Sequence, residues 1–167
     1  TGFHANCWYE RSFDLESSQD SIRVLLHFGA VDYRARVWVN HQFVGEHEGG
    51  HTPFVLDITS VLNLEGEQIV TVWAHDDPHD LAKPRCKQDW QLDAHSIWYP
   101  RTSGIWQTVW VECVPKTYIS RLRWTPHLER WEIGFEGFTS GEVLEELQLK
   151  VRLSIEGRLL VNDTYEV

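Results

Sequence analysis

Five side chains on one aperiodic stretch have the chemistry of a binding site for a polar ligand with a flat face. They comprise two carboxylates, two indoles and one guanidinium: Asp89, Trp90, Asp93, Trp98 and Arg101. A carboxylate accepts hydrogen bonds from ligand hydroxyls, and a guanidinium donates a forked pair of bonds. An indole stacks on the apolar C–H face of a sugar ring. These residue types suit a polar ligand with a flat face, and contact with a neighbouring domain is an equally open interpretation.

The stretch that carries these residues extends from His75 to Gly104 with hardly any periodic pattern. A loop of this length in a compact domain is usually functional or disordered, and its many large apolar side chains argue against disorder. Directly after Gly104, residues 105–111 are rich in aromatic and β-branched side chains, which predicts a strand. We therefore expect a loop whose exit is anchored in a packed sheet, where binding residues commonly lie.

The acidic run from His75 to Asp80 is the candidate for a metal site on this loop. Calcium needs more oxygen ligands than its three Asp supply without backbone carbonyls, and zinc needs a tetrahedral set of His and Cys. We therefore interpret the run as a hydrogen-bonded acidic turn and expect no metal or other cofactor.

Two catalytic interpretations of the loop find little support. Cys86 lies between two cations that favour a thiolate, but no His–Asp or His–Asn pairing is evident to make it a nucleophile. Asp89 and Asp93 are four residues apart on irregular backbone, which does not fix the separation that a catalytic carboxylate pair requires. No residue of this chain is therefore assigned a catalytic role.

The apolar pattern of the remaining chain predicts an all-β protein. Alternation over residues 9–15, 22–28, 33–39 and 54–58 is typical of half-buried strands. Residues 69–74 are apolar on both faces, as in an interior strand between two layers. We expect one helical turn over residues 60–62, capped by Asp57 or Thr59. Asn40 and His41 occupy a tight turn that needs positive φ, so His41 should strain or lengthen it.

Composition narrows the function classes. A net charge of −10 and a pI near 5.3 argue against nucleic acid, which needs a basic face. No apolar run approaches the length of a membrane span, and residue 1 is not followed by signal-peptide features. Three widely spaced cysteines fit neither a disulfide framework nor a paired metal site. Free thiols point to a reducing compartment such as the cytoplasm.

The chain has nine tryptophan residues, which is more than the core of a small β domain needs. We expect about two-thirds of them to be structural.

The segment Val114-Pro115-Lys116 predicts a domain boundary, because proline cannot continue a central ladder. Beyond it, residues 119–124 and 131–138 are expected strands, and residues 149–155 and 159–165 form an expected hairpin that turns at Glu156-Gly157. The chain is thus divided into domains 1–115 and 116–167.

The order of segments resembles the N-terminal sugar-binding domain of glycoside hydrolase family 2, the β-galactosidase and β-glucuronidase family. The matching pieces are WYERSF (8–13), HFGAVDYRARVWVN (27–40), VGEHEGGHTPFVLDIT (44–59), DDP (76–78), PRCKQDW (84–90) and TSGIWQTVWVE (102–112). Two positions depart from the family pattern, since His41 and Cys86 stand where the family usually has Gly. A Cβ at residue 86 predicts a changed backbone there, because only glycine takes left-handed conformations freely.

The resemblance implies a jelly-roll, galactose-binding-domain-like β-sandwich followed by the opening strands of an immunoglobulin-like β-sandwich. Four strands are fewer than the seven of such a sandwich, so we expect a fragment of a longer chain. The family cleaves glycosides with retention through two carboxylates in a later (β/α)8 barrel. The resemblance thus implies a non-catalytic domain whose loop forms a wall of the sugar pocket, with the carbohydrate and the barrel of the same parent chain as partners.

Two alternatives remain open at this point: a free-standing carbohydrate-binding module, and a structural domain that orients the barrel. The sequence does not separate galactoside, glucuronide and mannoside specificity. It also leaves the oligomeric state open, a homo-oligomer included.

Overall fold

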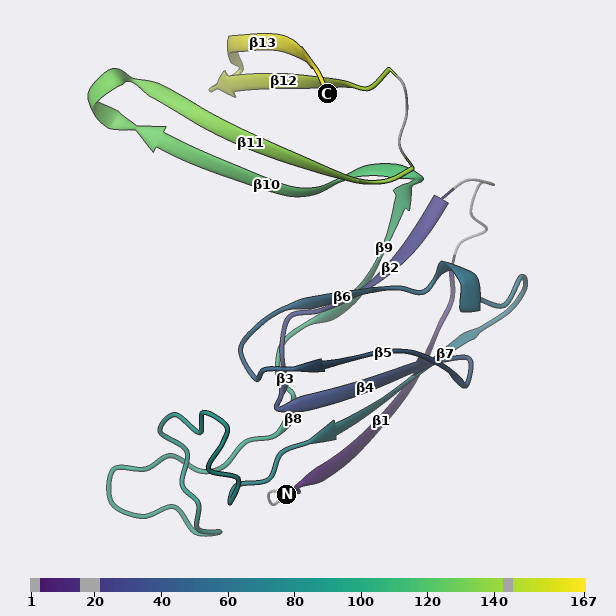
Figure 1. Ribbon diagram of the computed structural model, residues 1–167, viewed down its shortest axis with the longest axis vertical. Helices are drawn as coiled ribbons and strands as arrows, with labels where there is room; N and C mark the ends of the chain where they lie inside the picture. The colour runs from purple at the N-terminus through teal and green to yellow at the C-terminus, as the bar shows by residue number, and fades with distance from the viewer. Residues whose placement is uncertain (1–3, 16–21, 143–145) are drawn as a thin grey trace. The chain divides into compact units, whose positions relative to one another are not determined.

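The computed structural model describes residues 4–15, 22–142 and 146–167. The chain divides into two compact units, Thr1–Val114 and Pro115–Val167. Figure 1 shows the first unit in purple to teal and the second in green to yellow. In the described part of the chain, the structure has no helix of the length and apolarity that crossing a membrane requires.

The first unit contains an antiparallel four-stranded sheet in the order β1-β7-β4-β5. Its strands are β1 (Asn6–Phe13), β7 (Gln68–His75), β4 (Arg34–Val39) and β5 (Gln42–Glu48). β7 pairs with β1 on one side and β4 on the other, which confirms the interior strand predicted over residues 69–74.

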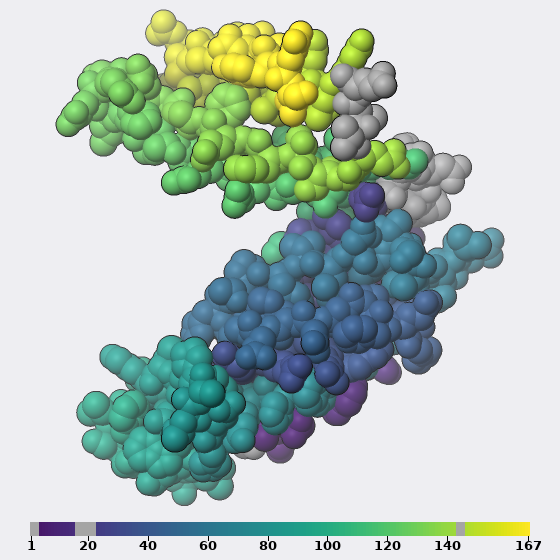
Figure 2. Space-filling view, in the orientation of Figure 1, coloured from purple at the N-terminus to yellow at the C-terminus, as the bar shows by residue number. Residues whose placement is uncertain are grey.

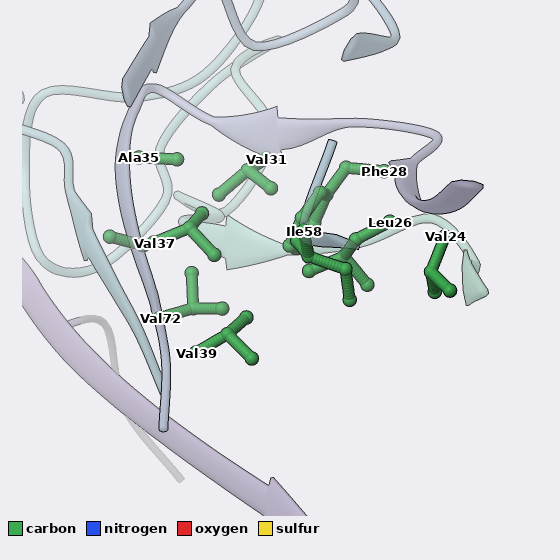
Figure 3. Packing of buried hydrophobic residues seen from close by; sticks show 10 residues of the cluster. Val24, Leu26, Phe28, Val31, Ala35, Val37, Val39, Ile58 and Val72 are labelled. Carbon is green, nitrogen blue, oxygen red and sulfur yellow. The ribbon is translucent and has the colours of Figure 1, made fainter. Parts of the chain in front are cut away.

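A second layer consists of β6 (Phe54–Asp57), β2 (Ile22–Phe28) and β9 (Val109–Pro115), in that order. A short pair, β3 (Val31–Asp32) with β8 (Gly104–Ile105), forms a separate two-stranded sheet. The all-β sandwich class predicted from the sequence is thus confirmed. Apolar side chains of both layers meet in one core, seen from close by in Figure 3. The buried residues of this core are Val24, Leu26, Phe28, Val31, Ala35, Val37, Val39, Ile58, Val72 and Ala74.

The buried core is aliphatic apart from Phe28, and it contains no tryptophan. All nine Trp lie in the described part of the chain, and none of them is buried. Strand alternation explains why: Val37 and Val39 face the core from β4, so Trp38 between them points outward. Trp73 lies outward between Val72 and Ala74 for the same reason.

The turn between β4 and β5 keeps two residues, so of the two outcomes expected from His41, strain or lengthening, the turn is not lengthened and His41 takes a strained positive φ. Val39 pairs with Gln42, and Asn40 and His41 take φ values of 49° and 65°. Asn40 is fixed by its side chain, whose Oδ1 accepts the Ile69 N–H at 2.9 Å. Its Nδ2 donates to the Val61 carbonyl, also at 2.9 Å. These bonds hold the first turn residue in the left-handed region.

A single turn of 3₁₀-helix, η1 (Thr59–Val61), follows β6 close to the predicted position. The N-cap residue is Ile58, and no side chain caps the turn, so the capping expected from Asp57 or Thr59 was wrong. Asp57 Oδ1 instead accepts the Thr59 N–H at 3.0 Å in a local turn.

The second unit consists of two antiparallel hairpins. β10 (Thr117–His127) pairs with β11 (Glu132–Gly141) across a short 3₁₀ turn, η2 (Leu128–Arg130). β12 (Gln148–Ile155) pairs with β13 (Arg158–Glu166). These four strands confirm the strand predictions for this part of the chain.

Candidate functional site

The predicted long loop is confirmed over residues 76–103, between the end of β7 and the start of β8. In Figure 2 its teal atoms form a lobe at one end of the first unit. The strands at both of its ends belong to the packed sandwich, so the loop is anchored on rigid structure.

Gln88 ties the loop to the strands at its base. Its Nε2 donates to Asp32 Oδ2 at 3.0 Å, and its Oε1 accepts the Thr102 N–H at 2.9 Å. Next to it, the Tyr99 N–H donates to the Lys87 carbonyl at 2.9 Å, and the Asp89 N–H donates to the Tyr99 carbonyl at 2.8 Å. These bonds join the middle of the loop to its end, and we call them the loop neck.

Asp89 lies inside the loop with no exposed surface. Its Oδ1 accepts the Gln91 N–H at 2.9 Å, and its Oδ2 accepts the His95 N–H at 2.7 Å. The same Oδ2 lies 2.6 Å from Nδ1 of the His95 ring. Desolvation alone would raise the pKa of Asp89, but these hydrogen bonds outweigh it and leave the pKa below its usual value. Asp89 therefore fixes the turn of residues 89–95, and its oxygens are taken up by the loop itself.

The turn fixed by Asp89 positions the two predicted indoles. Trp90 meets Trp98 edge-on with ring centroids 5.7 Å apart, and it meets the His95 ring edge-on at 5.3 Å. The Arg85 guanidinium lies 4.8 Å from the centroid of the Trp90 ring. Both indoles are half-buried. The structure thus brings Asp89, Trp90 and Trp98 together as one cluster.

The other two predicted residues are placed differently. Asp93 is exposed on the segment that the Asp89 carboxylate closes. Arg101 is half-buried and lines a small polar pocket that Asp89 also lines.

This polar pocket is also lined by two buried acids, Asp32, which sequence reasoning did not select, and Asp76, which it considered only as part of the acidic run. Burial raises the pKa of Asp32, the neighbouring Asp76 raises it further, and the hydrogen bond from Gln88 opposes the rise. Asp76 pairs with Lys83, which is also buried. The sequence feature that could have indicated a buried Asp76 is its position directly after an apolar strand, where a buried polar group needs a hydrogen-bond partner.

The acidic turn predicted over residues 75–80 is confirmed. Asp77 Oδ1 accepts the His79 N–H at 2.9 Å, and Asp80 Oδ1 accepts the Ala82 N–H at 2.8 Å. Among the residues that the structure describes, no group of three His, Cys, Asp or Glu side chains is arranged to hold a metal ion.

Cys86 is exposed and takes a φ of 55°. The position therefore adopts the left-handed conformation despite its Cβ. Gln88, two residues later, is accordingly free to form the loop neck.

The loop exit differs from the single strand predicted over residues 105–111. β8 ends at Ile105, and β9 begins at Val109 in another sheet. Between them, Trp106 Nε1 donates to the Gly50 carbonyl at 2.7 Å, and its ring meets His51 edge-on. This anchor secures the loop exit across the change of sheet.

Comparisons with known proteins agree with this architecture. The model of the "Glycosyl hydrolases family 2, sugar binding domain" matches residues 2–115. A β-galactosidase of Thermoanaerobacter pseudethanolicus is 32% identical over 67% of this chain and 14% of its own length. A β-glucuronidase of Rattus norvegicus is 30% identical over 94% of this chain and 27% of its own length. The chain therefore spans a minor part of these relatives.

Solved structures show the same fold over nearly the whole chain. A putative β-galactosidase from Bacteroides fragilis superposes with a TM-score of 0.75 at 18% identity, covering 99% of this chain and 25% of the other. A β-glucuronidase from Ruminococcus gnavus gives a TM-score of 0.73 at 22% identity, covering 98% of this chain and 29% of the other.

Proposed function

Because the chain belongs to glycosyl hydrolase family 2, as its sugar-binding domain, we propose that it serves a larger β-galactosidase- or β-glucuronidase-like enzyme. The enzyme hydrolyses O-glycosidic bonds, and this chain supplies a non-catalytic part of it. The first unit carries the sugar-binding fold, and the second unit supplies the opening strands of an immunoglobulin-like sandwich.

The loop of residues 76–103 forms a wall of the sugar pocket in this proposal. The single observation that carries it is the pair of half-buried indoles, Trp90 and Trp98, held edge-on by a turn that the buried Asp89 closes. Preorganised rings cost less entropy on binding than mobile ones do. Asp93 and Arg101 supply polar groups on the same loop for sugar hydroxyls.

Asp89 takes a positioning role in this proposal, because its oxygens already accept the N–H groups of Gln91 and His95. A retaining glycosidase needs two free carboxyl groups, roughly 5 Å apart, as acid/base and nucleophile. Asp89 is therefore unsuited to be one of them, and the reacting pair belongs to another part of the enzyme.

A second candidate, an autonomous carbohydrate-binding module, is favoured by a separate observation. Trp8, Trp38 and Trp73 form a cluster on the outward face of the four-stranded sheet. Trp8 stacks on Trp38 at 5.6 Å and lies 6.5 Å from Trp73, with 65% of its surface exposed. Exposed indoles on a flat sheet suit the apolar faces of a saccharide.

The test uses the longer enzyme with single tryptophans replaced. Trp98→Ala should lower kcat/KM for a glycoside substrate by roughly tenfold or more, since each 1.4 kcal/mol of lost transition-state binding is tenfold. Trp131→Ala is the matched control, because Trp131 is 96% exposed in the second unit and should leave turnover unchanged. Equal turnover in the two variants would refute the proposal that the loop forms a wall of the sugar pocket. Loss of saccharide binding by this chain in Trp8→Ala alone would favour the module.

A further inference from the structure

His95 is held from the interior of the loop by a buried carboxylate. Its Nδ1 lies 2.6 Å from Oδ2 of Asp89, which has no exposed surface, whereas 42% of the His95 side chain is exposed. His27 also contacts a carboxylate, but that of Glu112 is exposed. Among the described histidines, His95 is therefore the one whose ring is fixed by a buried acid and is still open to solvent.

The carboxylate decides which ring nitrogen carries the proton. Desolvation would raise the pKa of Asp89, but the hydrogen bonds from Gln91 and His95 outweigh it, so the carboxyl group is ionised at neutral pH. An ionised carboxylate can only accept hydrogen bonds, and Nδ1 of His95 must therefore donate. A neutral imidazole has one donor nitrogen and one acceptor nitrogen. In the neutral ring Nε2 is thus the acceptor.

Nε2 of His95 is not used by the chain itself. None of the residues that the structure describes forms a hydrogen bond with this nitrogen. The ring is nevertheless fixed in place, because Trp90 packs edge-on against it with ring centroids 5.3 Å apart. A fixed group costs less entropy on ligand binding than a mobile one. The loop therefore presents a preorganised acceptor beside the paired indoles Trp90 and Trp98.

We propose that Nε2 of His95 accepts a hydrogen bond from a hydroxyl group of the saccharide at this loop. The sugar rests on the proposed function, whereas the choice of a hydroxyl rests on the geometry of His95 and Asp89. The neutral ring offers only a lone pair at this nitrogen, so a ligand oxygen without a proton is disfavoured there. His95 is thus a specificity-determining residue that selects a hydroxyl donor.

The position of the proton is tested in this chain alone. A nitrogen–proton NMR correlation spectrum of the imidazole groups distinguishes protonated from unprotonated ring nitrogens, with the His95 signals assigned through His95→Asn. The neutral His95 ring should carry its proton on Nδ1 and leave Nε2 unprotonated. A neutral ring protonated at Nε2 would overturn the proposal, because this nitrogen would then be a donor.

Two substitutions separate binding from a purely structural role of His95. The amide of asparagine is as many bonds from Cβ as Nδ1 is, so His95→Asn can keep the contact with Asp89 but has no group in the place of Nε2. The amide of glutamine instead brings an acceptor oxygen to the place of Nε2. In the longer enzyme, His95→Asn should lower kcat/KM for a glycoside substrate roughly 3–10-fold, as one lost hydrogen bond predicts. His95→Gln should retain most of the activity, and a structural role predicts the reverse order.

Substrates that each lack one hydroxyl identify the contact. With one of them the unsubstituted enzyme should lose roughly 3–10-fold in kcat/KM, and His95→Asn should lose nothing further. His79→Asn is the matched control, because His79 is an exposed imidazole on the same loop, and it should behave as the unsubstituted enzyme does. Equal losses in His95→Asn and the unsubstituted enzyme for every such substrate would overturn the proposal. A His95→Gln variant weaker than His95→Asn would also overturn it.

Turnover of Trp98→Ala decides separately whether the loop forms a wall of the sugar pocket. Impaired Trp98→Ala beside unimpaired His95→Asn refutes the His95 contact and leaves the wall proposal standing. Unimpaired turnover in both variants refutes both proposals. Impaired His95→Asn that His95→Gln restores, beside unimpaired Trp98→Ala, supports the His95 contact and refutes the role of Trp98.

Discussion

Nδ1 of His95 lies 2.6 Å from Oδ2 of Asp89, and this contact closes the turn that carries the loop indoles. The carboxylate is fully buried, whereas the imidazole is partly exposed. The pair therefore links the interior of the loop to its surface, and Trp90 packs edge-on against its imidazole.

Asp89→Asn should loosen the ring cluster of Trp90 and Trp98. An amide has one acceptor oxygen in place of two, so at least one of the backbone N–H groups held by Asp89 loses its charged partner. Near-UV circular dichroism should lose part of its tryptophan signal while the far-UV β-signal is kept. Asp93→Asn, on the exposed part of the turn, is the control. An unaltered near-UV spectrum in Asp89→Asn would contradict the positioning role.

Gln88→Ala should destabilise the first unit by about 1–3 kcal/mol, because Asp32 loses its donor and the Thr102 N–H loses its acceptor. The free energy of unfolding in urea measures this change. Gln91→Ala removes an exposed amide side chain from the same loop and should cost less than about 0.5 kcal/mol. Equal losses in the two variants would show that the loop neck contributes nothing specific.

Asp32→Asn should change the pH dependence of stability. The folded pKa of Asp32 is raised, chiefly by burial, so the native state binds this proton more tightly than the unfolded state does. Stability from this group is present below the unfolded pKa, about 3.9, and is lost as pH rises through the folded pKa. The variant removes that loss, so its stability relative to the parent should improve from pH 3 to pH 7. Urea unfolding across this range measures it, and a parallel pair of curves would contradict the prediction.

His41→Gly should stabilise the first unit by up to about 1 kcal/mol. His41 has a φ of 65°, and a left-handed residue with a side chain costs roughly 1–2 kcal/mol, partly offset by the greater unfolded entropy of glycine. The thermal unfolding midpoint should rise accordingly. Gln42→Gly, in the adjoining strand β5, should lower the midpoint instead. A lower midpoint in His41→Gly would mean that the exposed imidazole stabilises the turn.

The strands were predictable from the sequence because their apolar residues alternate. Burial follows that alternation along β4, where Ala35, Val37 and Val39 face the core. The location of tryptophan was not predictable from hydrophobicity alone, since Trp38 and Trp73 lie at strand positions that face away from the core. Residue type selected the five loop residues, of which the structure brings Asp89, Trp90 and Trp98 together, but it did not indicate the structural role of Asp89. Its hydrogen bonds join residues up to six positions apart on aperiodic backbone, and no period indicates which N–H groups converge on a carboxylate.

The loop neck has a consequence for how this loop accommodates changes in length. Gln88 and Tyr99 are joined by an isolated parallel bridge, which divides the long segment into two shorter loops with closed ends. The entropy of closing a loop grows only with the logarithm of its length, by about 0.6 kcal/mol for each doubling. Residues inserted at 96–97, outside the turn that Asp89 closes, would enlarge one of these loops at small entropic cost and leave Gln88 bound to Asp32. The loop neck thus keeps the base of the loop fixed to β3 while the number of residues beyond the neck varies.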